Sequence, residues 1–110
     1  LGAFAALKQD NTVVTWGLAG GDSQAVHAQL HDVSRIRAAS DAFAAIRADR
    51  TVVTWGSPEL GGDSDSVRDQ LQNVADVYGS SLSFAAVLLD GTVVSWGQTQ
   101  LAGAEGCKSQ

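Results

Sequence analysis

The sequence predicts a mainly β protein made of tandem repeats of about 40 residues, each with a β-hairpin, a third strand and a short helix. Two observations support this prediction. Short runs rich in β-branched residues recur along the chain, and each hairpin run ends in the same Thr/Ser-Trp-Gly motif. Because one hairpin cannot bury both of its apolar faces alone, the repeats are expected to stack as the blades of a propeller-like array.

The repeat is defined by two motifs that return in the same order. Ala-Phe-Ala-Ala-Ile at 42–46 has counterparts at 3–7 and 83–87, and Thr-Val-Val-Thr-Trp-Gly at 51–56 has counterparts at 12–17 and 92–97. The tryptophans lie 39 and 41 residues apart, and a shorter loop after the first Trp-Gly explains the difference. The structural repeat positions are therefore Phe4, Trp16, Phe43, Trp55, Phe84 and Trp96.

The chain is interpreted as a single repeat array over residues 1–110. One complete unit, 33–73, lies between two partial units, 1–32 and 74–110. Because the first residues resemble the middle of a strand, we expect a piece of a longer array. With incomplete units at both ends, the chain is expected to self-associate or to be only marginally stable.

Each unit is expected to contain strands at positions equivalent to 43–47 and 51–55, preceded by a third strand at 33–39 or 74–80. Asp10-Asn11 and Asp90-Gly91 are typical of tight primed turns, in which both central residues take positive φ. Arg50 fits such a turn poorly, so the second hairpin is expected to differ there.

A short helix is expected to follow the turn at 61–64. Asp63 or Ser64 would accept hydrogen bonds from the N–H groups of its first turn. Val67, Leu71 and Val74 would then form one apolar stripe, because they are spaced at i, i+4 and i+7. About two turns of helix are stable only when packed against other structure.

Composition excludes several classes of function. The chain has 110 residues, 45% of them apolar, and a net charge of -5, which disfavours binding to nucleic acid and to anionic membranes. Four arginines lie close in sequence, and no aromatic platform is interleaved with them, which favours a solvated strand pair over a binding patch: Arg35, Arg37, Arg47 and Arg50. Cys107 is the only cysteine, so no internal disulfide forms; this favours an intracellular protein, although the sequence does not establish the compartment.

The motif at 43–56 resembles the regulator-of-chromosome-condensation type repeat, as does the third copy at 84–97, which reads Leu-Asp-Gly-Thr-Val-Val-Ser-Trp-Gly from Leu89. The resemblance covers nearly the whole chain and implies blades of a β-propeller. The unit is shorter than the family's usual repeat of nearly fifty residues, and a helix stands where the family commonly has a Gly-Gln-Leu-Gly-like stretch. A blade of three strands is therefore expected.

Several residues have both a functional and a structural interpretation. The equivalent tryptophans could form sugar-binding platforms, but packing between sheets is the favoured interpretation. Asp63, Asp65 and Asp69 resemble oxygen ligands of a metal loop, yet the first copy lacks most of these carboxylates. His27 and His31 have a spacing that can bind zinc, but the second copy has Arg68 and Gln72 there. No catalytic, cofactor-binding or metal-binding residue is assigned.

The leading hypothesis is a non-enzymatic protein-interaction or scaffold module. Its partner-facing loop is expected at the segment that changes length between copies, Ser57, Pro58, Glu59 and Leu60. One alternative is a repeat lectin that binds carbohydrate through the tryptophans. The resemblance implies another, namely part of a guanine-nucleotide exchange factor or a ubiquitin ligase.

Overall fold

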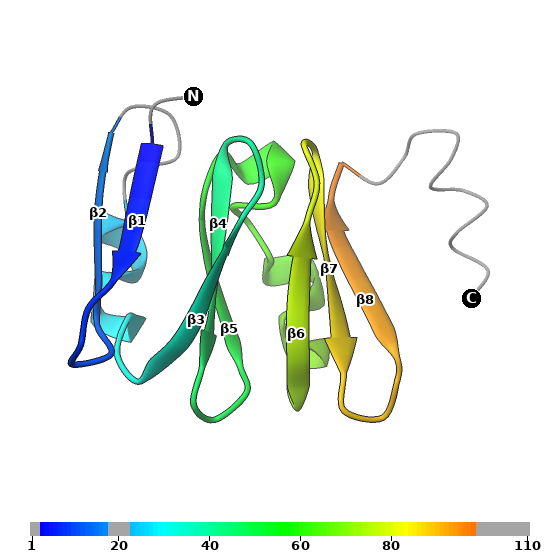
Figure 1. Ribbon diagram of the computed structural model, residues 1–110. Coiled ribbons are helices and arrows are strands. Elements are labelled where there is room, and N and C mark those ends of the chain that lie inside the picture. Colours follow the sequence, from blue (N-terminus) through cyan, green and yellow to red (C-terminus); the bar gives the residue numbers. More distant parts are fainter. Residues whose placement is uncertain (1–2, 18–22, 99–110) are drawn as a thin grey trace.

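The computed structural model describes residues 3–17 and 23–98. Within them the chain forms three small antiparallel sheets that stand side by side (Figure 1). The first sheet has two strands and the other two have three each, in the orders β1-β2, β3-β4-β5 and β6-β7-β8. The strands are β1 (Ala3–Leu7), β2 (Val13–Gly17), β3 (Val33–Ala38), β4 (Ala42–Arg47), β5 (Val52–Gly56), β6 (Val74–Gly79), β7 (Ser83–Leu88) and β8 (Val93–Gly97).

This arrangement confirms the predicted fold class and the third strand of each complete sheet. The hairpin register is identical in the three copies and pairs each phenylalanine directly with a tryptophan, as in Phe43 opposite Trp55. The two rings stack in every copy, with centroids 5.4 to 5.5 Å apart. The recurring Phe and Trp are therefore one cross-strand pair, a unit of sheet stabilisation.

The helices are of the 3-10 type, and none of them is long enough to contain the whole predicted apolar stripe. They are η1 (Gln24–Gln29), η2 (Pro58–Leu60) and η3 (Asp65–Gln70). Because η3 ends at Gln70, Leu71 follows the helix and Val74 already belongs to β6, so both are buried by other elements. Ser64 occupies the predicted N-cap position of η3, but its hydroxyl contacts Thr54 and caps no N–H group. The Asp63 carboxylate, one residue earlier, accepts the Asp65 N–H at 2.9 Å.

The predicted primed turns are wrong. Only the second residue of each pair takes positive φ: Asn11 at 67°, Arg50 at 67° and Gly91 at 89°. In each turn that residue donates its N–H to the carbonyl three positions back, as Arg50 does to Arg47 at 2.9 Å. This bonding is that of a three-residue hairpin loop with one left-handed residue and a bulge. The preceding Asp stabilises it, because Asp49 accepts the Thr51 N–H at 3.1 Å and the Thr51 hydroxyl at 2.6 Å.

The core lies between sheets, and each sheet presents two different faces. The alanine-rich face of β4, with Ala42 and Ala44, packs against the next sheet's Phe84 and Trp96. The opposite face of the middle sheet presents its own Phe43 and Trp55 to the first sheet. Small side chains on one sheet thus make room for the large aromatic pair on the next.

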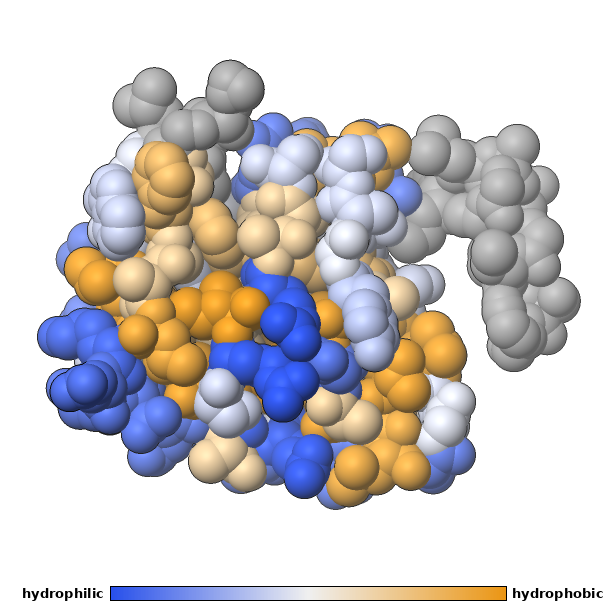
Figure 2. Space-filling view, viewed as in Figure 1, coloured by the Kyte–Doolittle hydropathy of each residue, from blue (hydrophilic) through white to orange (hydrophobic). Residues whose placement is uncertain are grey.

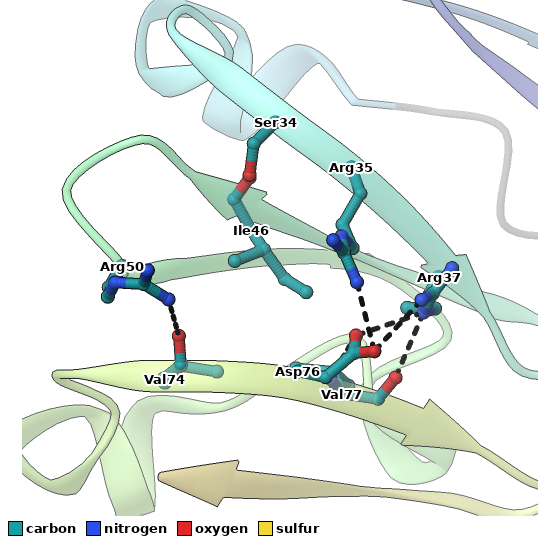
Figure 3. A network of polar contacts seen from close by, with 8 residues as sticks. All are labelled: Ser34, Arg35, Arg37, Ile46, Arg50, Val74, Asp76 and Val77. Carbon is teal, nitrogen blue, oxygen red and sulfur yellow. Dashed lines mark hydrogen bonds and ion pairs between the residues drawn. The ribbon is translucent and has the colours of Figure 1, made fainter. Parts of the chain in front are cut away.

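Polar contacts join the sheets at their first strands. Arg35 and Arg37 of β3 both donate hydrogen bonds to Asp76 of β6, and Arg37 also donates to the Val77 carbonyl (Figure 3). Figure 2 shows hydrophilic side chains gathered in the middle of this face, with apolar side chains to both sides. Farther along, Arg50 bridges the two sheets through its main chain, because its carbonyl accepts the Val74 N–H at 3.0 Å.

The first sheet leaves its aromatic pair uncovered by the described residues. Phe4 is 53% exposed and Trp16 is 51% exposed, whereas Trp55 and Trp96 are 4% and 3% exposed. None of the helices in the described part of the chain is long and apolar enough to cross a membrane.

Candidate protein-interaction groove

An open groove of about 630 Å³ runs along β5, the outermost strand of the middle sheet. Its walls come from η1 on one side and from η3 with the loop before it on the other. Residues from all of these elements line it: Val26, Gln29, Arg47, Asp49, Thr51, Val52, Val53, Thr54, Pro58, Gly62, Asp63, Ser64, Asp65, Arg68, Asp69, Leu71 and Gln72. Its volume is within the range of roughly 300–1,000 Å³ that ligand sites in proteins occupy.

The floor of the groove is an unpaired strand edge. Arg47 donates to the Thr51 carbonyl, so in the alternating antiparallel pattern Val53 and Trp55 bond to β4. The Ala39 N–H bonds to the Ala42 carbonyl on the other side of β4, which agrees with the same alternation. The main-chain N–H and C=O of Val52 and Thr54 therefore point outward, and no main-chain bond from the described residues reaches them.

The side chains of β5 hold the two walls in place. Val53 and Trp55 form one cluster with Leu30 and Val26, at the end and in the middle of η1. On the opposite face, Val52 packs with Leu71 and Val67 of the segment around η3. The edge of β5 thus lies between two short helices, at the place where a four-stranded blade would carry its outermost strand.

Hydrogen bonds from Thr54 hold the loop before η3 against the strand. Its hydroxyl lies 3.1 Å from the Gly62 carbonyl oxygen and 2.9 Å from the Ser64 hydroxyl, and it can donate to either. Gly62 is required there, because a Cβ at this position would come within 2.3 Å of the Gly56 carbonyl oxygen. This close approach and the contacts of the Thr54 hydroxyl leave Thr54 only 7% exposed, so Val52, which is half-buried, is the more open part of the edge.

The rim of the groove carries an excess of negative charge. Four carboxylates, from Asp49, Asp63, Asp65 and Asp69, face two guanidinium groups, from Arg47 and Arg68. The pKa of Asp49 is lowered, first by the Thr51 hydroxyl and then by the Thr51 N–H, so this carboxylate is ionised at neutral pH. Arg68 forms an exposed ion pair with Asp65 at 3.2 Å, which leaves the other carboxylates to set the charge of the rim.

The predicted partner-facing loop lies partly at this site. Pro58 lines the groove, and Pro58–Leu60 form η2. Ser57 anchors the loop, because its N–H donates to the Asp41 carbonyl and its own carbonyl accepts the Gly62 N–H. Glu59 is exposed, whereas Leu60 is half-buried. The structure therefore brings one of the four residues to the groove and presents a second to solvent.

Several other residues that the sequence offered as binding or metal sites do not form such sites. The indoles of Trp55 and Trp96 are buried, and Trp96 donates its Nε1 hydrogen to the Gly61 carbonyl at 3.0 Å, so neither can stack on a sugar. His31 contacts Asp32 at 3.0 Å, and no group of three or more metal-ligating side chains occurs in residues 3–17 and 23–98. Cys107 lies outside the described residues.

Sequence patterns did not identify the groove, although they did predict the three-stranded blade that creates it. The lining residues are spread over 26–72 and share no motif. The one usable signal was the absence of a fourth strand run between Trp55 and the next third strand, which implies an uncovered edge.

Comparison with known proteins shows which solved structures have a similar fold. No family model and no curated protein matches the chain. Solved structures do match: Prp20p from Saccharomyces cerevisiae (TM-score 0.65, 16% identity), human WBSCR16 (0.59, 19%) and the ectodomain of the Physcomitrella patens receptor kinase CR4 (0.57, 17%). These matches cover 87–91% of this chain but only 28–31% of those chains.

The chain therefore has a β-propeller-like repeat fold of the regulator-of-chromosome-condensation type and spans about a third of the length of these structures. At such low identity the likeness concerns the fold alone. The described residues form a row of three sheets and no closed ring.

Proposed function

We propose that the chain is a non-enzymatic protein-interaction module that binds its partner in the groove along β5. The observation that carries the proposal is an unpaired strand edge that forms the floor of a groove between two short helices, with a charged rim. The outward main-chain groups of a strand edge are a template for pairing, and a protein segment in extended conformation supplies the matching groups.

Two further facts support a protein partner. The net charge of -5 disfavours polyanions. Prp20p, which shares this fold, binds Gsp1p and histones, so one protein of this architecture has protein partners. The lectin alternative has little support, because two of the three equivalent tryptophans are buried.

Site-specific photocrosslinking tests the proposal. A photoreactive residue at Pro58, in the groove, is compared with one at Leu89, which is 58% exposed and outside the groove. We expect Pro58 to capture a protein that Leu89 does not, and the purified protein to bind the chain in titration calorimetry. Equal capture at the two positions, with no binding by the purified candidates, would contradict the proposal.

A further inference from the structure

We infer that the groove binds an extended, lysine- or arginine-bearing peptide that adds as a fourth strand to the edge of β5. This inference rests on the proposed function and specifies the binding mode and the chemistry of the partner. The geometry points to strand addition because the floor of the groove is a strand edge and not a face.

The open edge supplies a pairing ladder. Val52 and Thr54 together direct two N–H and two C=O groups outward, at alternate positions of β5. Val52 is half-buried and Thr54 is 7% exposed, so an added strand would pair first at Val52. An antiparallel or parallel strand pairs with such positions at a spacing of about 4.8 Å between strands. Main-chain bonds would give affinity without regard to sequence, and the walls would then select the side chains.

The two walls of the groove favour a peptide in which two kinds of side chain alternate. Successive residues of an added strand point to opposite faces of the sheet. One set would lie over η1, beside Val26, and the other over η3, beside Asp65 and Asp69. The first set meets Val26 and Gln29, and the second meets Asp69 beside the ion pair of Asp65 and Arg68.

The charge of the groove rim determines which charge the peptide should carry. With four carboxylates against two guanidinium groups, the rim attracts cations and repels acidic segments. Because these groups are exposed, the attraction is screened by salt, so binding should weaken as ionic strength rises.

The equivalent edge in the third sheet supplies a matched control. Val93 of β8 occupies the register of Val52, since Val52 pairs with Ile46 and Val93 pairs with Val87. Val93 is 55% exposed and does not line the groove. Proline is tolerated at an edge strand but removes the outward N–H and blocks pairing, so it tests one edge at a time.

The test uses fluorescence anisotropy with a labelled eight-residue peptide of alternating lysine and valine, and a glutamate–valine peptide as its counterpart. We expect the lysine peptide to bind the chain and the glutamate peptide to bind at least tenfold more weakly. Val52→Pro should weaken binding at least tenfold and Val93→Pro should not change it. Asp65→Asn/Asp69→Asn should weaken it roughly threefold to tenfold, and Asp32→Asn/Asp90→Asn, which removes the same charge elsewhere, should not.

A second measurement leaves the chain unchanged, in case Val52→Pro prevents folding. N-methylation of every second peptide amide removes the donors on one edge of the added strand. Methylating one set should abolish binding while methylating the other set leaves it, because only one edge faces β5. Equal effects of the two sets, or equal binding of the lysine and glutamate peptides, would overturn the inference. If the partner captured at Pro58 still binds Val52→Pro, strand addition is wrong and the interaction module stands.

Discussion

Arg37 of β3 donates two hydrogen bonds to the carboxylate of Asp76 on β6, at 3.1 Å from Nε and 3.0 Å from Nη2. The two residues belong to different sheets, so this two-point contact fixes one blade against the next. The Asp76 carboxylate is 19% exposed, and Asp76 also accepts the Val77 N–H at 2.8 Å.

Replacing Asp76 should destabilise the chain. We expect Asp76→Asn to lower the free energy of unfolding by about 1 kcal/mol at pH 7, measured by urea denaturation. The pKa of Asp76 is lowered, first by the hydrogen bond from Arg37, so its contribution is complete above the ordinary aspartate pKa of 3.8 and is lost as pH falls through the folded-state pKa. The effect of Asp76→Asn should therefore shrink in acid.

The exposed pair of Asp65 and Arg68 is the control for this prediction. Their side chains are 76% and 74% exposed, so Asp65→Asn should change stability very little. Equal losses from Asp65→Asn and Asp76→Asn would show that the contact between sheets contributes no more than a surface ion pair.

Gly61 should tolerate no larger residue. Its φ is 111°, and a Cβ there would come within 2.5 Å of the Phe84 ring, which is almost completely buried. We expect Gly61→Ala to cost about 2–4 kcal/mol, from backbone strain plus overpacking. Gly91→Ala, at φ 89° with nothing within 4 Å of its Cβ, should cost only about 1–2 kcal/mol. Thermal unfolding of both variants checks this prediction. Equal losses of stability in the two variants would contradict it.

Arg50 is the hairpin position where another residue would fit the backbone conformation with less strain. It has φ 67°, where the other copies have Asn11 and Gly91. We expect Arg50→Gly to raise the free energy of unfolding by about 0.5–1 kcal/mol, because glycine adopts this conformation without a Cβ clash. Both substitutions lose the weak 3.4 Å contact from the side chain to the Val74 carbonyl, but Arg50→Ala also keeps the strain, so it should not stabilise. Urea denaturation distinguishes the two, and a stabilising Arg50→Ala would refute the explanation.

The uncovered pair of Phe4 and Trp16 should promote self-association of the chain, since the same pair is buried in the other two copies. Sedimentation velocity should show oligomers that Trp16→Lys reduces. Tyr78→Lys, which changes an aromatic residue that is 59% exposed on β6, should leave them. A compact monomer at all concentrations would make this prediction wrong.

Much of the fold could be predicted because repetition supplies independent copies of the same pattern. Three versions of the Trp strand, each at the same distance from its Phe strand, are enough to indicate the hairpin. Turn type could not be read in the same way. Asp-Asn and Asp-Gly are compatible with two kinds of loop, and the structure decides between them, because within these pairs only Asn11 and Gly91 take positive φ and each donates its N–H to the carbonyl three positions back.

The polar contacts from Arg35 and Arg37 to Asp76 were missed because these residue types do not recur from copy to copy. Arg35 and Asp76 occupy equivalent positions, 41 residues apart, and carry opposite charges. That reversal of charge between copies was a usable signal, since equivalent strands of adjacent blades are neighbours. The groove was missed because its walls come from segments that precede two different sheets, and no local pattern marks their convergence.

The difference between the two faces of each sheet gives the array a direction. An alanine face always receives the aromatic face of the sheet that follows it in the chain. Duplicating or deleting one whole unit, the 39 or 41 residues between successive tryptophans, would therefore preserve this packing of an alanine face on an aromatic face, whereas a cut that divides a unit would not. The fold is suited to changes in copy number by recombination between neighbouring repeats, which can vary the number of blades while the packing between them is inherited unchanged.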